Sequence, residues 1–216
     1  MDFLIDLVKY FMQDSEIPKQ TSGTQTNTEH TVKAHSREEA KNIYRRACKR
    51  LLNINIWHKL GGTASAEFEL IDKNGKEEDR LAKENDYFKI KIPAPGSSAG
   101  DGYDWVKVEK IEDRSDADAE EESFLMRVRP SQDPNNKNTD VAHFLSDDAT
   151  STFIISRKNN TVTASVHGRN EKPNTEAKGI LDKIRNAVVG STAAAGVSKI
   201  QWKLLVKGLL ADEVPD

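Results

Sequence analysis

The stretch "TSTFIISRKNNTVTASVHG", residues 150–168, holds two runs of alternating apolar and polar residues on either side of Asn159 and Asn160. Asparagine tolerates the positive φ that a two-residue hairpin turn demands. A turn centred there sorts the side chains into two apolar pairs, Ile155 with Ala164 and Phe153 with Val166, and two polar pairs, Ser156 with Thr163 and Thr152 with His167. Because side chains alternate between the two faces of a strand, this agreement predicts a β-hairpin with one buried face.

The same alternation continues upstream, in five further segments between residues 30 and 130. Each offers apolar side chains to one face and charged or polar ones to the other. The apolar sets are Val32 and Ala34; Ala66, Phe68 and Leu70; Phe88, Ile90 and Ile92; Val106 and Val108; and Phe124, Met126 and Val128. About seven strands with one apolar face each are typical of an antiparallel sheet that is covered on one side.

Two segments have the helical periodicity needed to cover that face. Residues 37–52 follow Ser36, a typical N-cap, and repeat apolar residues at helical spacing. A second helix is expected from Thr175, with a break or kink between Gly190 and Gly196 because its apolar stripe changes side there. The stripe of the first part contains Ile180, Ile184 and Val188, and the displaced stripe contains Val197, Ile200, Leu204 and Gly208.

The order strand, helix, six meandering strands and long C-terminal helix resembles the START-like helix-grip superfamily of the polyketide cyclase or SRPBCC type. The first helix also ends in "NIWHKLGG", residues 55–62, just before the second strand. The resemblance covers residues 28 to 190 or beyond. It implies an α+β fold in which a curved, about seven-stranded antiparallel sheet wraps around the C-terminal helix, with an apolar ligand cavity between them. One such domain is expected over residues 30–216, with a C-terminal helical extension.

The first residues form a separate pattern. Residues 1–13 place Phe3, Leu4, Leu7, Val8 and Phe11 at helical spacing. Two early aspartates argue against a secretory signal, so we expect a short amphipathic helix. Residues 14–29 are rich in Ser, Thr and Gln and are expected to be a polar linker.

Composition restricts the partners. A net charge of -3 over 216 residues, with acids and bases interleaved, gives no field that would attract nucleic acid. No segment has the roughly 20 apolar residues of a membrane span. The single Cys48 excludes an internal disulfide and suits a buried position, so a reducing cytoplasm is the expected location. The histidines form no recognised metal pair, and we expect no metal and no cofactor.

No catalytic residue is predicted, because nearly every inward position of the sheet is apolar. Trp57 is interpreted as a core plug or as part of the cavity entrance, with His58 beside it. His58 and His143 are both expected near the surface, and Asp104 at the mouth of the cavity. The residues expected to line a cavity are Tyr44, Trp57, Phe68, Phe88, Ile90, Val106, Val108, Phe124, Met126, Phe153, Ile155, Ala164, Val166 and Ile184.

Three functions remain open. The first is a non-catalytic domain that binds a hydrophobic small molecule between the sheet and the C-terminal helix. The second is an interaction module, in which the terminal amphipathic segments meet within one chain or across a homodimer. The third is a cyclase-like or dehydratase-like enzyme that would use Tyr44, Trp57, His58 or His143. A cavity of a few hundred Å3 would favour the first, and inward polar groups with perturbed pKa values would favour the third.

Overall fold

The structure, a computed structural model, describes residues 16–62, 66–91, 97–174 and 192–214. The expected N-terminal helix and the expected first part of the C-terminal helix, with Ile184, lie outside the described residues. The elements in chain order are β1 (Thr24–Lys33), α2 (Arg37–Leu52), η1 (Ile54–Ile56), α3 (Trp57–Leu60), β2 (Glu67–Ile71), β3 (Tyr87–Lys91), η2 (Ser98–Gly100), β4 (Asp104–Arg114), β5 (Glu121–Pro130), β6 (Thr150–Lys158), β7 (Thr161–Glu171) and α5 (Thr192–Leu210).

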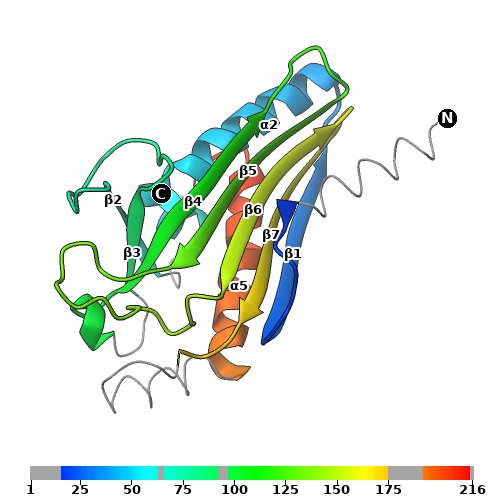
Figure 1. Cartoon of the computed structure of the whole chain (residues 1–216). Coiled ribbons are helices and arrows are strands. Elements are labelled where there is room, and N and C mark those ends of the chain that lie inside the picture. Colours follow the sequence, from blue (N-terminus) through cyan, green and yellow to red (C-terminus); the bar gives the residue numbers. More distant parts are fainter. Residues whose placement is uncertain (1–15, 63–65, 92–96, 175–191, 215–216) are drawn as a thin grey trace.

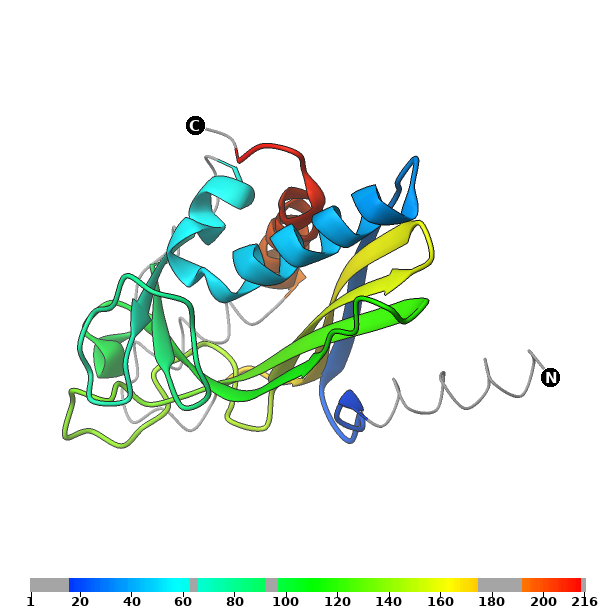
Figure 2. The same ribbon diagram turned by 90° about the horizontal axis from the view of Figure 1, so that it is seen from above.

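The strands form one antiparallel seven-stranded sheet in the order β1-β7-β6-β5-β4-β3-β2. Helices α2 and α5 lie against its concave face, as Figures 1 and 2 show. This is the α+β helix-grip arrangement that the resemblance implied. The β6–β7 hairpin has the predicted register, with Ile155 opposite Ala164 and Phe153 opposite Val166, and Asn159 turns at φ 53°.

Strand β1 is longer than the sequence pattern indicated. It begins at Thr24, so residues 24–29, expected to be linker, are strand instead. Their pairing with β7, from Thr24 opposite Glu171 to Lys33 opposite Thr161, satisfies backbone groups whatever the side chains are. Because β1 is an edge strand, its side chains are only partly covered, and the segment therefore lacks the apolar alternation of a buried strand.

Ser36 caps α2, because its hydroxyl accepts a hydrogen bond from the backbone N–H of Glu39 at 3.1 Å.

Helix α5 contacts α2 and α3 through backbone groups as well as through apolar side chains. The buried Arg50 of α2 donates to the carbonyl oxygen of Gly208 near the end of α5. A Cβ on Gly208 would lie 2.4 Å from the carbonyl oxygen of Leu60, so glycine lets α5 approach α3 closely.

The segment just before β1 lies on the other side of the sheet from α5 (Figure 2). The Oδ1 atom of Asn170 in β7 accepts hydrogen bonds from the backbone N–H groups of Thr21 (2.8 Å) and Ser22 (3.2 Å). Glu16 forms an ion pair with Arg114 at the end of β4. These contacts fix the direction from which the chain enters the domain.

Candidate functional site

Trp57 fills the centre of the core. It is 1% exposed, and its ring centroid lies 5.1 Å from that of Phe153, 5.4 Å from Phe68 and 5.7 Å from Phe88. The indole N–H donates to the carbonyl oxygen of Leu51 at 3.2 Å, at the end of α2. Trp57 is therefore the plug where helix α2 passes into the sheet, and His58 is its half-buried neighbour.

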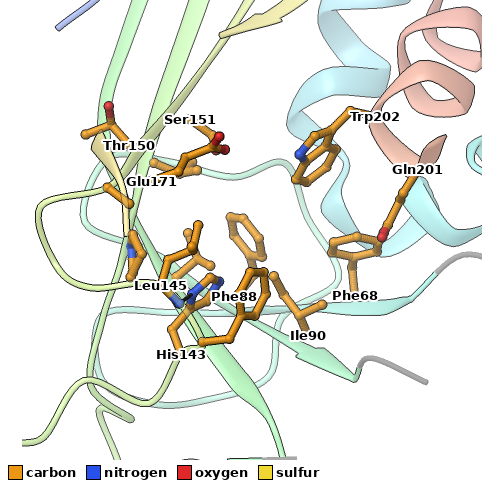
Figure 3. A pocket seen from close by; sticks show the side chains of 15 residues that line it. Phe68, Phe88, Ile90, His143, Leu145, Thr150, Ser151, Glu171, Gln201 and Trp202 are labelled. Atoms are coloured by element: carbon orange, nitrogen blue, oxygen red, sulfur yellow. Dashed lines mark hydrogen bonds between the residues drawn. The ribbon is translucent and has the colours of Figure 1, made fainter. Parts of the chain in front are cut away.

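A cavity of about 80 Å3 lies next to this aromatic cluster (Figure 3). It is enclosed by residues of strands β2 to β7, the loop 143–149 and helix α5. This volume is small beside the roughly 300–1,000 Å3 of pockets for drug-sized ligands. It accommodates a molecule of a few heavy atoms or one end of a larger molecule. Its lining is mostly apolar, with a few polar groups: Phe68, Phe88, Ile90, Val106, Val128, Pro130, His143, Phe144, Leu145, Ala149, Thr150, Ser151, Glu171, Gln201 and Trp202.

Four of the residues expected to line a cavity do so, namely Phe68, Phe88, Ile90 and Val106. Nine others share the buried core with them but do not border the cavity, because Trp57 and its neighbours fill the space that they enclose. These nine are Tyr44, Trp57, Val108, Phe124, Met126, Phe153, Ile155, Ala164 and Val166. Whether any of the four contacts a ligand stays a prediction.

Glu171 is an inward ionisable group that the alternation pattern did not reveal. Asn170 adopts φ 56°, and the register of β7 with β1 shifts between Thr24 and Thr26. Such a bulge re-aims the following side chain. Glu171 thus reaches the concave face, where its carboxylate accepts a hydrogen bond from the Thr26 hydroxyl at 3.3 Å. A Cβ on Gly168 would lie 2.3 Å from the Glu171 Oε1 atom, so glycine leaves room for this carboxylate.

Burial raises the pKa of Glu171 above its ordinary value, and the Thr26 hydrogen bond and the charge of Arg169 oppose this only in part. The folded protein therefore holds the Glu171 proton more firmly than the unfolded chain does. The stability that this group contributes is present at low pH and is lost as the pH rises through the folded-state pKa. A carboxyl group whose pKa is raised by burial, and which lies at the wall of a cavity, is a candidate functional group.

His143 is buried, so the expectation that it lies near the surface is wrong. Its Nδ1 atom accepts a hydrogen bond from the backbone N–H of Leu145 at 2.9 Å, and its ring stacks on Phe144 at 4.4 Å. The amide of Asn174 donates to the carbonyl oxygen of His143 at 3.1 Å. These contacts hold the loop against the chain that follows β7, which turns His143 toward the cavity. Asp104 is also fully buried instead of standing at a mouth.

The opposite end of the core holds the remaining candidates for chemistry. The Tyr44 hydroxyl lies 2.9 Å from the Ser115 hydroxyl, and burial raises the pKa of Tyr44. Burial likewise raises the pKa of the Cys48 thiol to about 12. Both groups therefore stay protonated at neutral pH, which suits structural roles more than nucleophilic ones.

The described part of the chain holds no group of three His, Cys, Asp or Glu side chains that could bind a metal ion. Within the same residues, no helix is long and apolar enough to cross a membrane.

No family model and no curated protein matches the sequence. Among solved structures, the chain is similar to a protein from Arthrobacter aurescens (TM-score 0.42, 9% identity, covering 90% of this chain and 95% of that one). It is also similar to Ara h 8.0201 (TM-score 0.31, 10% identity, 85% and 99% covered) and to truncated norcoclaurine synthase from Thalictrum flavum (TM-score 0.32, 13% identity, 88% and 99% covered). Likenesses at these values give no information on ligand or activity.

Proposed function

We propose that this helix-grip domain binds a small, largely apolar molecule in the cavity beside Trp202, without chemically changing it. The observation that carries the proposal is the lining itself, which combines aromatic and aliphatic walls with a few inward polar groups. Ligand sites typically have this composition. The volume of about 80 Å3 limits the occupant to a small molecule or to the end of a larger one.

Titration with 1-butanol, followed by the backbone amide NMR signals, tests this proposal. We expect saturable shifts at residues around the cavity. Ala149→Leu should abolish them, because it places three extra carbons in that space. The control Val162→Leu adds one carbon to the packed core at the far end of β7 and should leave binding unchanged.

Shifts that stay linear with concentration, or that survive Ala149→Leu, would contradict cavity binding. Native mass spectrometry of the purified protein would then identify any retained natural ligand.

A second candidate function is homodimerisation through the terminal helices. The side chains of Ile200 and Leu204 on α5 are 63% and 41% exposed, one helical turn apart. The apolar stripe of residues 1–13 is a chemically suitable cover for them. The described chain before β1 lies across the sheet from α5 (Figure 2), which favours contact between two chains over contact within one.

We expect Ile200→Glu with Leu204→Glu, or removal of residues 1–15, to convert a dimer into a monomer. Light scattering coupled to size-exclusion chromatography measures the change. Leu81→Glu is the matched control, because Leu81 is also a large exposed apolar residue, at 42%, but lies in the connection between β2 and β3 and not on α5. A full-length protein that is already monomeric at high concentration would rule out this candidate.

An enzymatic function stays an alternative. Of the residues first considered for chemistry, His143 borders the cavity, and Glu171 borders it as well, with a raised pKa. An acid and a base in one cavity are the minimum that proton transfer requires. Identification of a retained ligand would allow its turnover to be followed directly. The cytoplasmic location also stays a prediction.

A further inference from the structure

We propose that the ligand carries an ammonium group, which sits between the carboxylate of Glu171 and the indole ring of Trp202. This inference rests on the proposed binding function and specifies the chemistry of that same cavity. Figure 3 shows the two side chains on facing walls, Glu171 beside Ser151 and Trp202 above Gln201.

The charges around the cavity favour a cation over an anion. Among the described residues that line it, Glu171 is the one carboxylate and His143 the one imidazole, and none is Lys or Arg. A fatty acid or another anionic ligand would therefore meet a carboxylate and no Lys or Arg side chain among the described lining residues. Arg169, whose charge acts on Glu171, does not line the cavity. Its guanidinium donates to the Asn27 side chain at 2.9 Å and to the Thr26 carbonyl at 3.1 Å.

The backbone is shaped to present this carboxylate. The bulge at Asn170 and the absence of a side chain at Gly168 are both needed for Glu171 to point inward. Without a ligand, the carboxylate loses hydration and has the Thr26 hydroxyl as its hydrogen-bond partner. An ammonium group in the cavity would place an opposite charge directly beside this carboxylate.

Trp202 supplies the second half of the site. Its ring meets Phe153 edge-on at 5.3 Å and Trp57 at 6.4 Å, so its orientation is fixed by the core. Tryptophan offers the strongest cation–π surface among the aromatic residues. The apolar body of such a ligand would lie against Phe68, Phe88 and Ile90.

Three probes with the same four-carbon body test the inference: n-butylamine, 1-butanol and butyrate. At neutral pH, we expect butylamine to bind about tenfold more tightly than butanol, as one good ionic contact allows, and butyrate to bind most weakly. Glu171→Gln should remove most of the preference for butylamine over butanol without changing butanol binding. Glu29→Gln, which removes an exposed carboxylate from the neighbouring strand β1, is the control and should change neither.

The outcomes separate this inference from the function on which it rests. Equal binding of butylamine and butanol, or unchanged butylamine binding in Glu171→Gln, would overturn the ammonium site and leave cavity binding intact. Preferred binding of butyrate would also overturn it. If none of the three probes binds, the proposed function fails together with the inference. Trp202→Leu provides a second variant, in which butylamine should lose affinity more than butanol does.

Discussion

Trp57→Ala is expected to lower the free energy of unfolding by about 3–5 kcal/mol, the range for truncation of large buried aromatic residues. Three phenylalanine rings, one each from β2, β3 and β6, contact the indole with centroids 5.1–5.7 Å away, and the Trp202 ring lies at 6.4 Å. Removal of the indole would leave a cavity between the helices and the sheet. These elements are held by their other contacts and cannot move far enough to fill it. Urea titration followed by circular dichroism measures the loss.

His58→Ala is the matched control for this prediction, because His58 is the next residue in α3 but is only half-buried. We expect its effect to stay within about 0.5 kcal/mol, as at most positions away from the core. A loss below about 1 kcal/mol for Trp57→Ala would mean that the ring borders open space instead of packed side chains. In that case Trp57 would belong to the ligand cavity after all.

Most strands and the helix α2 could be predicted from the sequence, because one face of each is apolar and the other is polar. The register of the β6–β7 hairpin follows from the alternation around Asn159, and the start of α2 follows from its Ser36 cap. Edge strand β1 was harder to place. In residues 24–29 both faces carry only Thr, Gln, Asn and Glu, and the side chains are at most partly buried, so no alternation of apolar and polar residues marks this half of the strand.

The polar part of the candidate site could not be predicted in the same way. Glu171 lies on the outward phase of β7 if the alternation runs unbroken from Val162, and the bulge at Asn170 brings it inward. A signal is present in "HGRNE", residues 167–171, where a glycine and an asparagine interrupt the strand pattern. His143 was missed for another reason, since its burial depends on loop contacts between residues far apart in the sequence, such as Asn174.

Glu122→Gln is the other change expected to cost about 3–5 kcal/mol, because it would leave a buried arginine without its counter-ion. Glu122 and Arg157 are cross-strand partners on the concave face, with Arg157 Nε 2.5 Å from the Glu122 carboxylate and side-chain exposures of 4% and 0%. The guanidinium also donates to the carbonyl oxygens of Ala119 at 2.7 Å and of Asn159 at 3.1 Å. It thereby ties the β4–β5 loop to the hairpin turn.

The double variant Glu122→Leu with Arg157→Leu separates the charge from the packing. It removes both ions at once, so the penalty of an unpaired buried charge disappears, and apolar replacement of such pairs is often neutral or stabilising. Here some loss should remain, because the carbonyl oxygens of Ala119 and Asn159 lose their donor. We therefore expect the double variant, in urea titration, to be more stable than Glu122→Gln alone but less stable than the unaltered protein. If Glu122→Gln unfolds at the same urea concentration as the unaltered protein, then the backbone carbonyls alone compensate the charge of Arg157, and the ion pair contributes nothing to the fold.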